Sequence, residues 1–144
     1  MPADIDPALL RIVANQKRGV LVTLKRDGRP QLSTVAYAFD AERATIRISV
    51  TDTRAKTRNL RRDPRCSFFV NTGDMGPYAV LEGTAQLTPV TTDPHDASAE
   101  ELVDVYRAIS GEHSDWDEYR AAMITDQRLV VSFVIEYAYG FAPG

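Results

Sequence analysis

Hydrophobic and polar residues alternate with a period of two in several separate segments of the chain, as is typical of β-strands with one buried face. The alternation is strict over 44–50, where Ala44, Ile46, Ile48 and Val50 share one face and polar side chains share the other. Similar patterns, or short apolar runs bounded by turn residues, predict six strands. These cover 19–24, 30–40, 44–50, 66–71, 78–87 and 128–141.

Two of these strands have features that bear on their place in the fold. The strand over 30–40 has one face that is polar at its start and apolar beyond, which is expected of a strand that begins at a site and ends in a core. That face carries Gln31, Ser33, Val35, Tyr37 and Phe39. The strand over 128–141 is apolar on both faces, so we expect the core on one side and a second subunit on the other.

Helical patterns and turn residues complete the element prediction. Asp6 and Pro7 suit the cap and first position of a helix whose Leu9, Ile12 and Val13 share a face. Further helices are predicted over 53–62, 97–110 and 114–123, the last with Ser114 in a capping arrangement. Asp27-Gly28 predicts a hairpin turn between the first two strands, and Gly83 a bend within the fifth.

Six hairpin-linked strands with a few helices predict a mainly β fold, a small antiparallel barrel. The 144 residues, 44% hydrophobic and 26% charged, indicate one globular domain over 1–144. A chain of this length buries one modest core, which favours a functional site between two subunits over a closed internal one.

Several functional classes find no support in the sequence. Cys66 is the only cysteine, so no intrachain disulfide forms, and His95 and His113 lack partners at metal-ligand spacing. No apolar run approaches the length of a membrane span, and Asp4 and Asp6 oppose a signal peptide, so we expect a cytoplasmic protein without a membrane partner. We find no catalytic triad, carboxylate pair or metal site.

The segment over 49–64 carries the strongest chemical signal. It joins a strand to a helix, and Thr51, Asp52 or Thr53 can cap that helix. Free amides of a first helical turn attract phosphate, yet Arg54 and Lys56 put cations at this positive end, which an anionic ligand would compensate. Residues 51–65 hold six cations and two anions, a local balance of +4 in a chain of net charge −3.

The remaining cations, Arg58, Arg61 and Arg62, are more simply read as a solvated or salt-bridged surface. A nucleic-acid footprint is the third reading of the segment. The net negative charge and the acidic stretch over 93–118 oppose it, and we expect no nucleic-acid partner.

Three runs of the sequence together resemble the pyridoxamine 5'-phosphate oxidase-like split β-barrel superfamily, and its F420-dependent branch in particular. They are Arg29-Pro30-Gln31-Leu32-Ser33, Thr53-Arg54-Ala55-Lys56-Thr57-Arg58-Asn59-Leu60 and Tyr78-Ala79-Val80-Leu81-Glu82-Gly83. The stretches 111–120 and 137–140 also match that branch, so the resemblance covers nearly the whole chain. It implies a six-stranded antiparallel split β-barrel of Greek-key type, and a homodimer with two cofactor sites at its interface.

The resemblance also implies the roles of individual residues. Arg54 and Lys56 would hold the cofactor phosphate with help from Thr57 and Asn59. The isoalloxazine-like ring would be lined by Gln31, Ser33, Ser49 and Val50. Tyr78 would approach from the partner subunit. The loop Asp74-Met75-Gly76-Pro77 lacks the aromatic residue that several relatives carry before the matching tyrosine.

Three functions follow from this resemblance. The first is an F420-dependent reductase that transfers a hydride to a planar conjugated small molecule such as an enone, a quinone or a tetrapyrrole-like compound. Its chemistry would reside in the cofactor, with no catalytic residue required of the chain. The second is an FMN-dependent oxidase, although the basic residues that grip a phosphorylated substrate are not evident. The third is an F420-binding carrier without turnover. The aromatic face of Tyr137, Tyr139 and Phe141 is open to two readings, a flat substrate pocket or ordinary packing.

Overall fold

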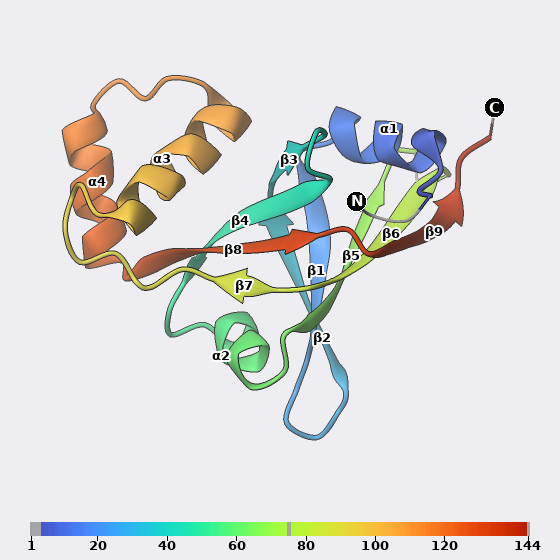
Figure 1. Ribbon diagram of the computed structural model, residues 1–144, viewed down its shortest axis with the longest axis horizontal. Helices are drawn as coiled ribbons and strands as arrows, with labels where there is room; N and C mark the ends of the chain where they lie inside the picture. Colours follow the sequence, from blue (N-terminus) through green and yellow to red (C-terminus); the bar gives the residue numbers. More distant parts are fainter. Residues whose placement is uncertain (1–3, 75, 144) are drawn as a thin grey trace.

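The strands pair into two antiparallel sheets in the computed structural model, which describes residues 4–74 and 76–143 (Figure 1). The five-stranded sheet has the order β2-β1-β5-β6-β9 and contains β1 (Arg18–Leu24), β2 (Pro30–Ala36), β5 (Arg65–Asn71), β6 (Tyr78–Thr84) and β9 (Tyr137–Phe141). The four-stranded sheet has the order β3-β4-β8-β7 and contains β3 (Ala38–Asp40), β4 (Thr45–Thr51), β7 (Gln86–Leu87) and β8 (Arg128–Val134). The mainly β class is confirmed, whereas this pairing does not confirm a six-stranded barrel.

Three strands predicted as continuous are each interrupted, and each passes from one sheet to the other at the interruption. The breaks fall at Tyr37, at Ala85 and at residues 135 and 136. Strands that change sheet in this way form the corners of two sheets packed face to face. At the first corner the Tyr37 amide donates to the Lys17 carbonyl at 3.0 Å, and its hydroxyl donates to the Val13 carbonyl at 2.6 Å.

Gly83 lies at a close approach of the two sheets, two residues before the second corner. A Cβ atom added there would lie 2.6 Å from the Phe133 side chain and 2.6 Å from the Val134 carbonyl oxygen. The strand predicted to bend at Gly83 is instead interrupted at Ala85. Gly83 is required for another reason, because a side chain there would clash with β8.

The helices are α1 (Pro7–Asn15), α2 (Ala55–Arg62), α3 (Ala97–Ser110) and α4 (Trp116–Thr125). The Asp6 carboxylate caps α1 as predicted, since it accepts from the Ala8 amide at 2.9 Å. Two other cap predictions are wrong. The N-cap of α2 is Arg54, with no side-chain cap hydrogen bond, and the N-cap of α4 is Asp115, which accepts from the Glu118 amide. None of the helices in the described ranges has the length and hydrophobicity to cross a membrane.

The main core lies between the sheets, with α1 packed against β5, β6 and β9. Phe68 is at its centre, with ring centroids 5.0 Å from Tyr37 and 6.2 Å from Phe133. The alternation predicted over 44–50 is confirmed, because all four apolar side chains of that segment are buried in this core.

A second apolar cluster lies under α3 and α4, on the far side of the four-stranded sheet. Val130 of β8 and Ala38 of β3 pack there against Leu102, Val105 and Tyr119. The chain's own helices thus cover the second face of β8 at Val130, whereas Val134 at the other end of the strand is 48% exposed. A second subunit at that strand stays a prediction. The continuation of this segment as β9 exposes Tyr137, Tyr139 and Phe141, so these aromatics do not belong to the core.

Candidate functional site

A cavity of about 350 Å³ opens where β4 leads into α2, and we call it the cationic cavity. Two predicted ring-binding residues, Ser49 and Val50, and both predicted phosphate-binding residues, Arg54 and Lys56, line it. Residues 34–36 of β2, Thr51, Ile109 of α3 and Arg128 at the start of β8 complete the wall. The strand-to-helix segment, which the sequence marks by its concentration of cations, therefore forms one wall of this cavity.

Of the other four cations of residues 51–65, Arg58 is exposed and outside the cavity wall, and the remaining three have partners elsewhere. Arg61 forms an ion pair with Asp52, and Arg65 pairs with Asp63 at 2.7 Å. Arg62 donates to the Leu24 carbonyl and to the Asn59 side chain. The structural reading of Arg61 and Arg62 is confirmed, and it leaves Arg54 and Lys56 as the cations of this segment that face the cavity.

Arg128 is the third cation of the cavity. It pairs with Thr51, the last residue of β4, and so lies beside the segment that leads from β4 into α2. Its Nε is buried without a hydrogen-bond partner among the described residues, and its Nη1 reaches the Ser49 carbonyl and hydroxyl oxygens only at 3.5 Å. Such a guanidinium lacks the strong acceptors that a buried cation normally has.

The electrostatics of the cavity favour an anion. Burial, and then the neighbouring Arg54 and Arg128, lower the pKa of the Lys56 ammonium. The cavity wall, as far as the structure describes it, includes no carboxylate that would offset these charges. The first turn of α2 adds backbone amides that no side chain caps. This donor set fits the phosphate of a flavin-type cofactor, since an oxyanion beside Arg54 and Lys56 would relieve the repulsion among the three cations.

A second cavity of about 300 Å³ adjoins the first, and we call it the aromatic chamber. It lies between α3 and α4 on one side and β4 and β8 on the other, toward the end of the sheet where Figure 1 shows the two helices. Its wall shares Ala36, Ser49, Ile109 and Arg128 with the cationic cavity. Its remaining wall residues are Val105, Tyr106, Ser110, Tyr119 and Met123.

Five predicted cofactor residues lie outside the wall of the cationic cavity, and four of them lie on or beside α2 and the β1–β2 hairpin. The Asn59 side-chain amide donates to the Gln31 side chain at 3.0 Å and to the Thr23 hydroxyl at 3.1 Å, which ties α2 to β1 and β2. The buried Thr57 hydroxyl donates to the Thr51 carbonyl at 2.8 Å. Ser33 lies opposite Leu21 in the β1–β2 register. Their contact with a cofactor stays a prediction.

Tyr78 lies on a different surface, the outer face of the five-stranded sheet, where its ring centroid is 5.7 Å from that of Phe69. The loop before it, predicted to leave one side of the cofactor less covered, includes Met75, which lies outside the described residues.

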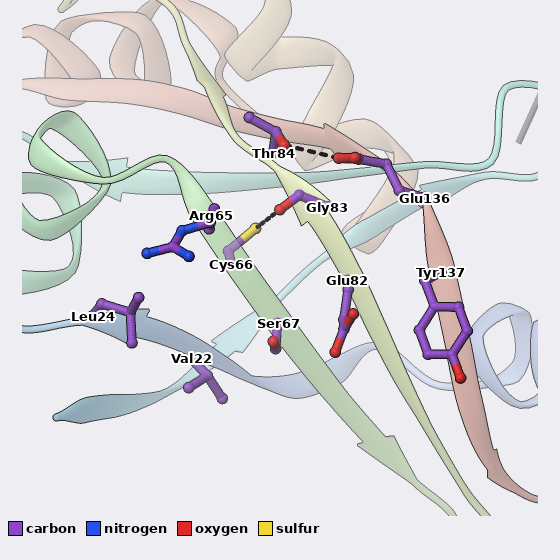
Figure 2. A pocket seen from close by; sticks show the side chains of 10 residues that line it. All are labelled: Val22, Leu24, Arg65, Cys66, Ser67, Glu82, Gly83, Thr84, Glu136 and Tyr137. Atoms are coloured by element: carbon purple, nitrogen blue, oxygen red, sulfur yellow. Dashed lines mark hydrogen bonds between the residues drawn. The ribbon is translucent and has the colours of Figure 1, made fainter. Parts of the chain in front are cut away.

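A third cavity, of about 490 Å³, lies on this outer face (Figure 2). Val22, Ser67, Glu82 and Tyr137 follow one another across four neighbouring strands. Cys66 at its edge points toward the Gly83 carbonyl, and burial, with a smaller effect of Glu136, raises the pKa of its thiol to about 12. A thiol with so high a pKa is protonated and unreactive at neutral pH. Arg54, Lys56 and Arg128 suit a cofactor phosphate, and we place the candidate cofactor site at the cationic cavity that they line.

Comparison with known proteins identifies the family of the chain. A family model described as pyridoxamine 5'-phosphate oxidase matches residues 5–139. The chain belongs to this family. The match covers residues of both sheets and the helices α1 to α4.

Solved structures with similar folds carry several different names. A conserved hypothetical protein of Mycobacterium tuberculosis is 23% identical with a TM-score of 0.73, over 98% of this chain and 86% of that one. A protein named F420 reductase is 20% identical with a TM-score of 0.68, over 94% and 98% of the two chains. An FAD-binding protein of Mesorhizobium loti is 20% identical with a TM-score of 0.68, over 95% and 94%. At these identities the likeness concerns the fold alone.

The family assignment leaves two groups of site residues that sequence reasoning missed. The first is Arg128, whose only signal is a cation at the start of a strand that is otherwise apolar on both faces. The second is the helical wall of the aromatic chamber, which includes Tyr106, Tyr119 and Met123. No sequence signal marks these as site residues, because their place depends on how α3 and α4 pack on β8.

Proposed function

We propose that this protein is an F420-dependent oxidoreductase that transfers a hydride between the reduced deazaflavin and a planar conjugated small molecule. The observation that carries the proposal is the convergence of Arg54, Lys56 and Arg128 on one cavity that opens beside an aromatic chamber. The first cavity suits the cofactor phosphate, and the second suits the flat ring of the small molecule. Membership of the pyridoxamine 5'-phosphate oxidase family and the fold shared with a protein named F420 reductase support this choice.

In this proposal the chain binds and orients. Arg54 and Lys56 hold the phosphate, with the first-turn amides of α2 as further donors. Ser49 and Val50, together with Gln31 and Ser33 on β2, lie against the ring. A reduced deazaflavin held there would supply the hydride, so no acid or base on the chain is required for that chemistry.

The same cavity also suits FMN, which carries a phosphate on a similar ring system, and the FAD-binding protein among the similar structures supports this second candidate. The decisive experiment is a side-by-side titration of the purified protein with F420 and with FMN, followed by quenching of cofactor fluorescence. We expect F420 to bind at least tenfold more tightly. Tighter binding of FMN would assign the protein to flavin-dependent chemistry, and binding of neither would remove the redox proposal.

Turnover separates an enzyme from a carrier. Reduced F420 is incubated with the protein and 2-methyl-1,4-naphthoquinone, and the return of oxidised F420 absorbance is recorded. We expect oxidation that depends on the protein concentration. Tight F420 binding without any catalysed oxidation of a panel of enones and quinones would favour a carrier.

We further propose that the active form is a homodimer in which the outer face of the five-stranded sheet meets its copy. Large hydrophobic side chains are exposed on this face, including Leu32 at 63% and Tyr137 at 58%. Two rows of paired residues cross it: Leu32, Val22, Ser67, Glu82 and Tyr137 in one, and Thr34, Val20, Phe69, Val80 and Tyr139 in the other. The second row is apolar except for Thr34, and exposed apolar side chains gathered on one face indicate an interaction site. Tyr78 lies on the same face, so the dimer would bring it to the second copy.

A further inference from the structure

The aromatic chamber has walls that are fixed before any ligand binds. The Tyr119 hydroxyl donates to the Leu102 carbonyl at 3.0 Å, and its ring centroid lies 5.0 Å from that of Tyr106. The Arg120 guanidinium donates at 2.6 Å to both the Glu100 carboxylate and the Pro94 carbonyl, which holds α4 against α3. Burial raises the pKa of Tyr119 to about 12, so its hydroxyl stays protonated and keeps donating. The chamber is therefore a preformed space.

The size of the chamber limits what it can hold. Ligand pockets in proteins span roughly 300–1,000 Å³. At about 300 Å³ the chamber lies at the lower limit of that range. One ring or two fused rings match this volume, whereas a tetrapyrrole macrocycle does not. The tyrosine rings and the side chains of Val105 and Met123 present an apolar surface to such rings.

The chamber is polar at one end only, where it meets the cationic cavity. Ser49 and Arg128 lie at this junction and belong to both walls. The buried Nε of Arg128 has no partner among the described residues, and its Nη1 contacts are at the outer limit of a hydrogen bond. An unpaired donor in a desolvated position is costly, and a carbonyl oxygen at this junction would offer an acceptor to the guanidinium.

We propose that the aromatic chamber binds the substrate as a flat conjugated carbonyl compound of one or two fused rings, with its oxygen directed to Arg128. This inference rests on the proposed function. It adds the place of the acceptor, between α3, α4 and the four-stranded sheet, and its size class. It also places the acceptor's polar end next to the proposed cofactor ring, since both cavities share Ser49.

Trp116 offers a direct readout of ligand binding. It is the only tryptophan of the chain, and its ring centroid lies 5.7 Å from Tyr106 and 5.6 Å from Tyr119, two walls of the chamber. The cofactor-free protein is titrated with 2-methyl-1,4-naphthoquinone, with excitation at a wavelength that tyrosine does not absorb. We expect saturable quenching. Linear quenching like that of free N-acetyltryptophanamide would overturn the inference.

The matched variants are Met123→Tyr, which fills the chamber, and Ile124→Tyr, which places the same ring on the same helix outside its wall. We expect the dissociation constant for the naphthoquinone to rise at least tenfold in Met123→Tyr and to stay within twofold in Ile124→Tyr. Ser110→Tyr, at an exposed position of the chamber wall, should give the same loss and replaces Met123→Tyr if circular dichroism shows that variant to be misfolded. Unchanged affinity in a folded chamber variant would overturn the inference.

F420 binding distinguishes this failure from a failure of the proposed function. We expect Met123→Tyr to bind F420 as tightly as the unaltered protein, while its KM for the naphthoquinone rises at least tenfold. Suppose that the unaltered protein does not bind F420 but binds the naphthoquinone, and that Met123→Tyr abolishes naphthoquinone binding. The redox proposal then fails, and the assignment of the aromatic chamber stands. If F420 binds and the chamber variants leave turnover of the naphthoquinone unchanged, the substrate does not bind in the aromatic chamber, and only this inference fails.

Discussion

The side chain of Asn59 donates a hydrogen bond to the side chain of Gln31 at 3.0 Å and so joins α2 to the second strand of the hairpin. The same amide donates to Thr23, and its oxygen accepts from Arg62 at 2.8 Å. Asn59 is only 6% exposed. This network fixes the helix that carries Arg54 and Lys56 relative to the sheet.

Replacement of Asn59 by alanine should therefore cost stability. The change removes three hydrogen bonds and leaves the buried Thr23 hydroxyl with one partner fewer, so we expect a loss of about 2–3 kcal/mol in the free energy of unfolding. Urea denaturation followed by circular dichroism measures it. Arg58→Ala is the control, since Arg58 is exposed on the same helix, and it should change stability by less than about 0.5 kcal/mol. Equal effects of the two changes would contradict the role given to the network.

How far the sequence predicts this fold depends on whether a feature is local. The period of two over 44–50 predicts the buried face of β4 because alternation along a strand is set by its own geometry. The three changes of sheet, at Tyr37, at Ala85 and after Val134, leave no such trace, because each depends on packing against a distant segment. Six strands are thus expected where the described residues form nine.

For the candidate site, too, the sequence predicts the residues with a local signal and misses those placed by distant packing. The charges of Arg54 and Lys56 conflict with the dipole of their own helix, and this local conflict is visible in the sequence. Arg128 reaches the same cavity from 72 residues beyond Lys56, through the pairing of β4 with β8. A cation at the start of an apolar strand does not by itself say which helix it faces.

Lys56→Ala should weaken cofactor binding with little effect on folding. Lys56 lies in the cationic cavity, where burial and two guanidiniums already lower its pKa, so the folded state gains little from its charge. Loss of one charge-assisted contact to a phosphate is worth about 1.5–3 kcal/mol, or roughly 10–150-fold in the dissociation constant. F420 and FMN titrations measure it.

The control for Lys56→Ala is Lys25→Ala, which removes the same charge from the exposed hairpin turn. It should leave the affinity within twofold. If both variants bind the cofactor alike, the phosphate does not lie against α2, and the placement of the cofactor must be abandoned.

Asp96→Asn should reduce stability at neutral pH in a way that disappears in acid. Burial opposes ionisation of Asp96, but hydrogen bonds from the amides of Thr92, Ala99 and Asp93 and from the Thr91 hydroxyl outweigh it and hold its pKa at about 2. Because the folded pKa lies below the ordinary value of 3.8, ionised Asp96 stabilises the fold above about pH 4, and this contribution is lost as the pH falls toward 2.

The measurement is urea denaturation of both proteins at pH 7, 4 and 2.5. We expect Asp96→Asn to be less stable by about 1 kcal/mol at pH 7, since the carboxylate caps α3 and interacts with its dipole, and the difference should shrink between pH 4 and 2.5. A constant difference for Asp96→Asn over this range would mean that its charge does not hold α3 in place.

The last prediction concerns the outer face of the five-stranded sheet and its proposed copy. Tyr139, 45% exposed, lies in the same row as Val80, Phe69 and Val20. Tyr139→Glu would place a second carboxylate near that of Glu82 in the neighbouring row. In a dimer formed by this face it would be buried among the apolar side chains of its own row, which is costly without a cation to pair with it. We expect the unaltered protein to sediment as a dimer at micromolar concentration and the variant as a monomer.

Val134→Glu serves as the control, because Val134 is similarly exposed at 48% but belongs to the four-stranded sheet. It should remain dimeric. Since Tyr78 lies on the same outer face as Tyr139, a monomeric Tyr139→Glu protein would lack the tyrosine that the second copy is proposed to bring to each cofactor, and should bind F420 more weakly. A protein that is monomeric at every concentration, or a monomeric variant with unchanged affinity, would show that each chain forms its cofactor site alone.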